Sequence, residues 1–204
     1  MGQRLVVNIE ADDVTVASIY YHWSAYTMSA LYTIRDIINS LYNGGFDPEN
    51  FTKEELMLRV INMCEASGGR LSQIEYDGDP SIEASNFKKM FPNREYKTSG
   101  SRDDGIVAFT DIGIEYQNGW ADGCAKIDLS NDKIELNVYS EFDSVEDMMQ
   151  QEWFEEDDIP TDIPKTDIYI GEFSFDDLDE IISFAESAVD GIFWSSDTLV
   201  CMLS

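Results

Sequence analysis

The chain has 204 residues, of which 43% are hydrophobic and 12% aromatic, and this composition indicates a folded protein with a sizeable core rather than a disordered one. Its 13 Lys and Arg residues stand against 41 Asp and Glu residues, and the net charge is −28. That charge excludes binding of DNA, RNA or an anionic membrane through a basic surface of the protein's own.

Neither a membrane span nor a secretory leader is visible in the sequence. No apolar run approaches the roughly 20 residues that cross a bilayer, and the N-terminal residues do not have the pattern of a signal or transit peptide. We therefore expect a cytoplasmic protein. The three cysteines, Cys64, Cys124 and Cys201, are far apart and lie in apolar surroundings, which predicts buried free thiols in a reducing compartment.

The chain opens with the pattern of a β-hairpin and a helix. Residues 4–9 and 14–21 are strand-like apolar runs, and Ala11, Asp12 and Asp13 form the expected turn between them. Apolar residues then recur at helical spacing over residues 24–42, where the pattern predicts the first helix.

A second helix begins at a capping box formed by Thr52 and Glu55, and a Gly-Gly pair at residues 68–69 ends it. The pattern is weaker over residues 70–102, where we expect one short helix over residues 82–91. This segment also holds the only local concentration of positive charge, whose role the sequence does not reveal: Lys88, Lys89, Arg94, Lys97 and Arg102.

The next segment predicts a buried strand over residues 105–110, a short helix over 111–120 and a second hairpin. The arms of this hairpin, residues 124–129 and 133–139, alternate between apolar and polar side chains. Such alternation is typical of a sheet with one face in the core and one in water.

Acidic residues dominate the last third of the chain. Residues 141–204 contain 19 acids and one base, for a net charge of 1 − 19 = −18, whereas residues 1–140 carry 12 − 22 = −10. This third has the patterns of folded structure: a strand over residues 168–173, then a helix with Ser174 as N-cap and Asp177 completing a capping box, and a final strand or packed tail over residues 192–194 and 199–203.

These elements predict an α+β fold with antiparallel strands and three to four flanking helices. We expect an α+β core over residues 1–140 and an acidic strand–helix lobe over residues 141–204, packed on the core as one domain. No period of 20 to 50 residues repeats.

The sequence shows no catalytic, metal-binding or nucleotide-binding signature, and it predicts no enzyme activity, no metal and no cofactor. The acid-rich stretches lack the spacing of a calcium loop, and zinc has no pairs of Cys or His residues to use. The glycine pairs follow helices instead of opening them, so they are not phosphate cradles. His22, in the segment YYHWSAYT, is the remaining candidate, either as a catalytic base with a nearby Ser or acid or as a structural residue.

The charge itself suggests a function. Carboxylates fixed on a folded surface at the density of DNA phosphates, which lie about 3.4 Å apart along each strand, can occupy a Lys/Arg groove built for nucleic acid. Aromatic residues among the acids (Trp153, Phe154, Phe173 and Phe175) could anchor such an interface. The plainer alternative is that the acids only keep the protein soluble. The residues expected to contact the partner are Glu152, Trp153, Glu155, Glu156, Asp157, Asp158, Asp176, Asp179 and Glu180.

Three stretches, MGQRLVV, YYHWSAYT and GIVAF followed by GIEYQNGWADGCAKIDL, resemble uncharacterised proteins of phages and prophages. Small acidic phage proteins include anti-CRISPR and anti-restriction proteins, several of which mimic nucleic acid. The resemblance implies a counter-defence inhibitor that binds the basic nucleic-acid groove of a host CRISPR nuclease or restriction enzyme, without binding nucleic acid itself. The alternative is an acidic structural or adaptor protein of phage assembly. Mimicry leaves the YYHWSAYT segment unexplained.

Overall fold

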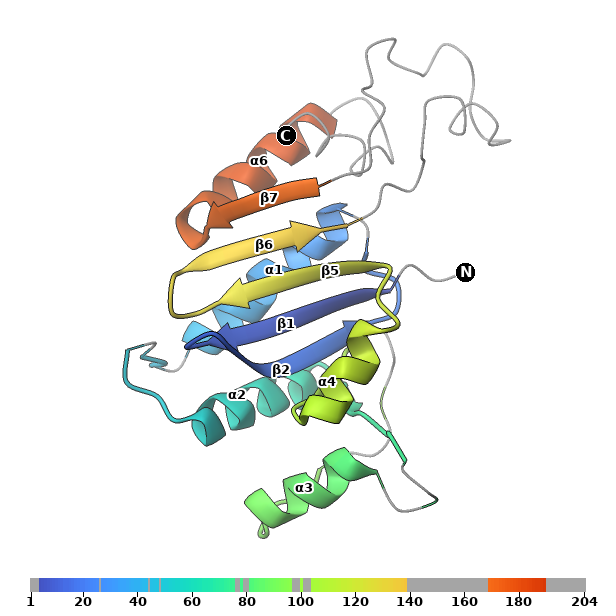
Figure 1. The fold of residues 1–204 in the computed structure, drawn as a ribbon. Coiled ribbons are helices and arrows are strands. Elements are labelled where there is room, and N and C mark those ends of the chain that lie inside the picture. The colour runs from blue at the N-terminus through green and yellow to red at the C-terminus, as the bar shows by residue number, and fades with distance from the viewer. Residues whose placement is uncertain are drawn as a thin grey trace, which may run out of the picture.

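A computed structural model describes residues 4–25, 27–43, 45–47, 49–75, 78, 81–96, 100, 104–138 and 169–189. In this part of the chain seven strands form one sheet in the order β3-β4-β2-β1-β5-β6-β7 (Figure 1). The strands are β1 (Leu5–Ala11), β2 (Val14–Tyr21), β3 (Arg70–Leu71), β4 (Ile106–Ala108), β5 (Gly123–Asp128), β6 (Lys133–Asn137) and β7 (Tyr169–Ser174).

The sheet is mixed rather than purely antiparallel, which corrects the expectation from the sequence. Both predicted hairpins, β1–β2 and β5–β6, are antiparallel, but β1 pairs with β5 in parallel and β3 pairs with β4 in parallel. Four of the six strand pairings are antiparallel as expected, and one of the two parallel pairings, β1 with β5, joins the first hairpin to the second.

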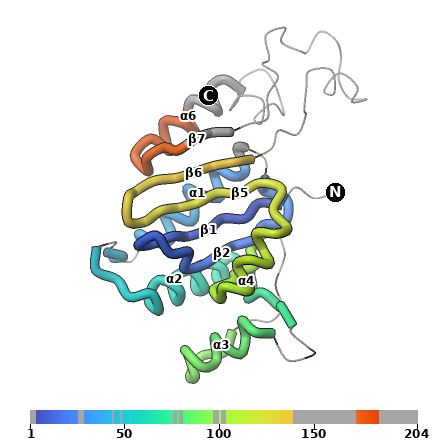
Figure 2. The backbone as a smooth tube through the Cα atoms, viewed as in Figure 1, coloured from blue at the N-terminus to red at the C-terminus, as the bar shows by residue number. Residues whose placement is uncertain are grey.

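Five α-helices lie in the described part of the chain, more than the three or four expected. Among them α1 and α2 cover one face of the sheet, α4 lies against β2 and β4 on the opposite face, and α6 packs on α1 (Figures 1 and 2). The helices are α1 (Thr27–Tyr42), α2 (Lys53–Ala66), α3 (Ile82–Met90), α4 (Asp111–Asn118) and α6 (Leu178–Val189). None of these helices is long and apolar enough to cross a bilayer.

Local side-chain chemistry sets several element boundaries. Asp12 and Asp13, with φ of 52° and 60°, form the tight turn of the first hairpin in the left-handed conformation that Asp tolerates. The hydroxyls of Thr52, Ser81 and Thr110 each accept a backbone N–H in the first turn of α2, α3 and α4. Thr52 is confirmed as the N-cap of α2, since its hydroxyl accepts the Glu55 N–H, which is one of the two hydrogen bonds of the predicted capping box. The helix α1 begins three residues later than the pattern indicated.

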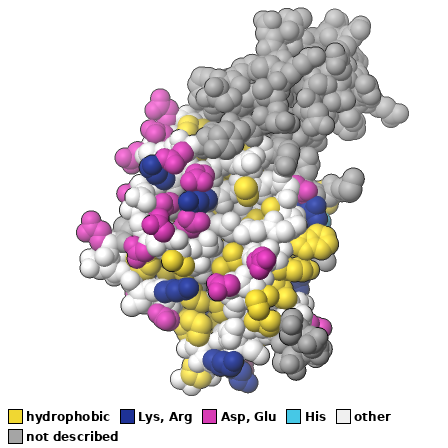
Figure 3. All heavy atoms as spheres, in the orientation of Figure 1, with side chains coloured by type: hydrophobic (Ala, Val, Ile, Leu, Met, Phe, Trp, Pro, Cys, Tyr) yellow, Lys and Arg dark blue, Asp and Glu magenta, His cyan; other side chains and the backbone are white. Residues whose placement is uncertain are grey.

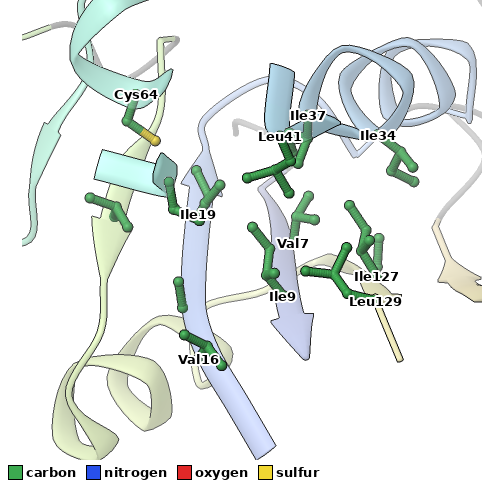
Figure 4. Packing of buried hydrophobic residues seen from close by; sticks show 14 of the residues in the cluster. Val7, Ile9, Val16, Ile19, Ile34, Ile37, Leu41, Cys64, Ile127 and Leu129 are labelled. Atoms are coloured by element: carbon green, nitrogen blue, oxygen red, sulfur yellow. The ribbon is translucent and has the colours of Figure 1, made fainter. Parts of the chain in front are cut away.

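The core lies between the sheet and helices α1 and α2. Ile34, Ile37 and Leu41 of α1 project onto Val7 and Ile9 of β1 and onto Ile127 and Leu129 at the end of β5 (Figure 4). Cys64 of α2 lies on the same side of the sheet, beside Ile19 (Figure 4). Cys64 is buried as expected, but Cys124 is exposed on the polar face of the sheet, because it alternates with the buried Gly123 and Ala125.

The acidic end of the chain extends the same sheet. β7 pairs with β6, and Leu178 and Ile182 of α6 are buried in the core. Ser174 caps a short 3-10 turn (η2, Phe175–Asp177) through the N–H of Asp176, and α6 follows that turn. The expected boundary at residue 140 and the final strand or packed tail over residues 192–194 and 199–203 lie outside the described residues, so the division into a core and a lobe stays a prediction.

Candidate functional site

Three of the residues predicted to contact a partner lie together at the junction of β7 and α6. Asp176 belongs to η2, Asp179 and Glu180 belong to the first turn of α6, and all three side chains are exposed. Within the described residues no Lys or Arg forms an ion pair with any of them. The other predicted contacts lie outside the described residues: Glu152, Trp153, Glu155, Glu156, Asp157 and Asp158.

The junction of β7 and α6 lies beside the turns of both hairpins, because all three connections leave the same end of the sheet. The backbone N–H of Phe175 donates to the carbonyl of Asp132 at 2.9 Å, which links β7–α6 to the β5–β6 turn. The Asp12 N–H donates to Ser130 Oγ at 2.8 Å, which links the β5–β6 turn to the β1–β2 turn. Three segments far apart in the sequence thereby form one surface.

This surface, called here the acidic edge, consists of the carboxylates of these three connections: Asp12, Asp13, Asp128, Asp132, Asp176, Asp177, Asp179 and Glu180. All of them are exposed except Asp128, which is half-buried and accepts the N–H groups of Ser130 and Asn131. Lys133 is the cation that begins β6 here, and it is hydrogen-bonded to Glu172, which raises the pKa of Lys133. Asp and Glu side chains gather at this end of the molecule in Figure 3.

Aromatic residues contact the acidic edge from the side of the core. The Tyr42 hydroxyl donates to Asp132 Oδ1 at 3.3 Å, and burial together with the nearby Asp132 charge raises the pKa of Tyr42 to about 12. The ring of Tyr42 meets Phe175 edge-on at 6.3 Å. Phe173 and Phe175, expected as free anchors for a partner, instead pack against the core.

Sequence reasoning missed the four aspartates of the hairpin turns as members of this surface. The sequence pattern predicts Asp12 and Asp13 only as a turn, and it places Asp128 in one arm of the second hairpin and Asp132 between the two arms. In the structure Asp132 also has a positive φ, of 53°. The signal that could have found them is the parallel pairing of β1 with β5, since it brings the two turns to one edge. Hydrophobic alternation does not specify that pairing.

His22 lies far from the acidic edge, just after the end of β2. Its Nδ1 lies 2.8 Å from the Tyr20 hydroxyl, and its ring meets Trp23 edge-on at 4.9 Å. Among the described residues its hydrogen-bond partner is thus a phenol and not a carboxylate. No group of three or more His, Cys, Asp or Glu residues in this part of the chain is placed to hold a metal ion.

The basic segment is partly neutralised from within. Arg94 forms a 2.8 Å ion pair with Glu65 of α2, while Lys88 and Lys89 end α3 with exposed side chains. Lys97 and Arg102 lie outside the described residues.

Comparison with known proteins adds no family to this geometry. No protein-family model matches the chain, and neither a curated protein nor a solved structure matches it. The resemblance to phage counter-defence proteins therefore stays a prediction.

Proposed function

We propose that the protein is an acidic inhibitor that binds the basic nucleic-acid groove of a host defence nuclease, a CRISPR nuclease or a restriction enzyme, and excludes DNA or RNA from it. The observation that carries this proposal is the acidic edge. Its carboxylates come from three connections that hydrogen bonds hold to one another at one end of a packed sheet.

Rigid placement matters because a mimic must present its charges without first ordering them. Ordering a flexible acidic segment costs free energy at the moment of binding, whereas the carboxylates of the acidic edge stand on two hairpin turns and a capped helix. Phosphates are recognised mainly by Lys and Arg side chains, which also donate hydrogen bonds to carboxylates, Arg often through two parallel bonds. Among the described residues of this edge the cation is Lys133, which is hydrogen-bonded to Glu172 and so does not offset the aspartates.

The experiment is to neutralise the acidic edge without changing its shape. Asn tolerates the left-handed turn positions that Asp12, Asp13 and Asp132 occupy, so Asp→Asn is the substitution that keeps these turns. The variant combines Asp12→Asn, Asp13→Asn, Asp132→Asn, Asp176→Asn, Asp179→Asn and Glu180→Gln. Its inhibition of DNA binding is measured by gel shift against a panel of purified CRISPR nucleases and restriction enzymes.

The matched control neutralises the same number of exposed acids elsewhere: Glu49, Glu54, Glu75, Glu95, Asp111 and Glu115. We expect the control to inhibit as the unaltered protein does and the edge variant to lose inhibition. Equal inhibition by both variants, or no inhibition of any nuclease in the panel by the unaltered protein, would contradict the proposal. Self-assembly on size exclusion in place of nuclease capture would favour the phage-assembly alternative.

Complex formation should also weaken steeply with salt. The Debye length falls from about 10 Å at 0.1 M to about 3 Å at 1 M ionic strength, so an interface made of exposed charge pairs loses most of its attraction over this range. A dissociation constant that does not change across the same range would show that the acidic edge does not carry the affinity.

A further inference from the structure

A pocket opens at the end of the sheet opposite to the acidic edge. It is a cavity of about 440 Å³, within the range that small-molecule sites occupy. Its lining residues come from the residue before β1, the end of β2 and the turn after it, β3 and the segment that follows it, the start of β4, and the end of α4 with the turn after it. The side chains lining it include Arg4, Arg70, Tyr20, His22, Tyr116 and Trp120.

The charge of this pocket is opposite in sign to that of the protein. In a chain with 41 acids, none of the described lining residues is Asp or Glu, while two are arginines and one is the histidine. The bulk charge of −28 therefore does not predict the local potential here, since charges farther away than the Debye length of about 8–10 Å are largely screened.

Arg4 does not supply the free positive charge. Its Nε and Nη2 donate to the two carboxylate oxygens of Asp122 at 2.7 and 2.8 Å, a bidentate pair that neutralises it. Its guanidinium also lies 5.5 Å from the centre of the Trp120 ring. Arg4 thus positions the indole at the rim of the pocket.

Arg70 has N–H donors that no described residue accepts. Of the arginines in the described residues, Arg4, Arg35, Arg59 and Arg94 each form an ion pair, and Arg70 forms none there. Its Nη1 donates to Gln73 Oε1 at 3.2 Å, while its Nε is buried with no acceptor in the same part of the chain. A guanidinium has five N–H donors, and leaving a buried donor unpaired costs free energy. An anionic ligand can recover that free energy if the Arg70 side chain reorients so that its donors pair with the ligand.

Aromatic rings form the rim beside this cation. Tyr116 and Trp120 lie one turn apart at the end of α4, with ring centres 6.2 Å apart, and each is 52% exposed. Hydrophobic side chains gather over α4 in Figure 3. Gln117 cannot serve a ligand, because both ends of its amide are already hydrogen-bonded. Its Oε1 accepts from Ser18 Oγ, and its Nε2 donates to the Ile106 carbonyl. It fixes the helix that carries the rim.

From an arginine that lines the pocket and forms no ion pair with any described residue, and from two exposed aromatic rings at the rim, we infer that this pocket binds a nucleoside monophosphate. Arg70 pairs with the phosphate through its guanidinium, and the base stacks on Trp120 at the rim. The volume exceeds what an inorganic anion alone would fill. The pocket is also lined by Tyr20 and His22, which belong to the YYHWSAYT segment that mimicry leaves unexplained.

The test is isothermal titration calorimetry of the full chain with AMP, GMP, CMP and UMP. Adenosine and inorganic phosphate are titrated as separate probes. We expect saturable binding of at least one nucleotide, at least about tenfold tighter than adenosine or phosphate alone. Arg70→Gln and Trp120→Ala should each weaken that binding by about tenfold or more. Trp120 is half exposed, so its loss leaves the fold intact.

Arg35→Gln is the matched control, because Arg35 also lies over an aromatic ring, Tyr32, but outside the pocket. It should bind nucleotide as the unaltered protein does. Four outcomes would overturn the inference: no saturable binding up to about 5 mM, phosphate or adenosine binding as tightly as the nucleotide, a control as weak as the pocket variants, or Trp120→Ala binding unchanged. Thermal unfolding of each variant checks that lost binding is not lost folding.

Discussion

Replacing Glu83 with alanine should destabilise the junction between β4 and α4. Glu83 lies in α3 and is 0% exposed. Its carboxylate accepts the N–H groups of Phe109 and Thr110, each at 3.1 Å, and the Thr110 hydroxyl. That hydroxyl in turn accepts the Gly113 N–H and caps α4. The carboxylate therefore holds both the loop and the start of the helix.

The magnitude follows from the donors that the alanine leaves unpaired. Each buried N–H without a partner costs about 1–3 kcal/mol, and two such groups cost about 2–6 kcal/mol together. The substitution also removes the free-energy cost of burying the carboxylate, and this gain offsets part of the loss. We expect a net loss of about 2–4 kcal/mol in the free energy of unfolding, a large share of the 5–15 kcal/mol typical of a domain.

The assay is urea denaturation of the unaltered protein, Glu83→Ala and a control, Glu115→Ala. Glu115 is an exposed acid on α4 itself, so its removal should change the free energy of unfolding by less than about 0.5 kcal/mol. If Glu83→Ala were as stable as this control, the carboxylate would not hold the junction and the reasoning would be refuted.

The same carboxylate gives a pH signature. Burial raises the pKa of Glu83 above its usual value, although its three hydrogen bonds act in the opposite direction. A raised native pKa means that the folded state binds the proton more tightly than the unfolded state, so this group adds stability at low pH and loses it as pH rises through the native pKa. The stability of the unaltered protein relative to Glu83→Gln, which does not titrate, should therefore decrease from acid to neutral pH. A difference independent of pH would contradict the raised pKa.

Three further predictions concern other parts of the described chain. Gly113→Ala should lower the free energy of unfolding by about 1–3 kcal/mol, measured by urea denaturation, because a Cβ there would overlap Glu83 Oε1. Asp122→Asn should lower the free energy of unfolding by about 1 kcal/mol at neutral pH. Because Arg4 lowers the pKa of Asp122, the contribution of this carboxylate is lost as pH falls through the lowered pKa, and the free energies of unfolding of the two proteins should converge in acid. Thiol labelling with peptide mapping should modify Cys124 in the folded protein and Cys64 only in denaturant, since burial raises the pKa of Cys64 to about 12.

The local elements were predictable because their signals are local. The turn at Asp12 and Asp13 and the N-cap at Thr52 depend on a few neighbouring residues, and the structure has both. β3 could not be predicted, because a strand of two residues has no periodicity. Its pairing with β4 depends on a contact 36 residues away, between Arg70 and Ile106.

One feature of the sheet arrangement, the central position of β1, is indicated by the sequence. Leu5, Val6 and Val7 are consecutive apolar residues, all buried, and such a run is typical of a strand covered on both faces. That pattern indicates that β1 lies in the middle of the sheet and not at its edge. It does not name β5 as the neighbour, and without that pairing neither the acidic edge nor the pocket could be assembled from the sequence.

The two proposed sites can coexist in one small protein because the sheet separates them. β1 runs from the pocket, at Arg4, to the acidic edge, at Asp12, and its seven residues at about 3.4 Å each place the ends roughly 24 Å apart. That distance is more than twice the Debye length at physiological salt, so the aspartates of one end only weakly oppose an anion at the other. The separation fails at low ionic strength, where the Debye length reaches about 30 Å at 0.01 M. Nucleotide affinity should therefore rise with added salt from 0.01 to 0.1 M, opposite to the salt response of the acidic edge.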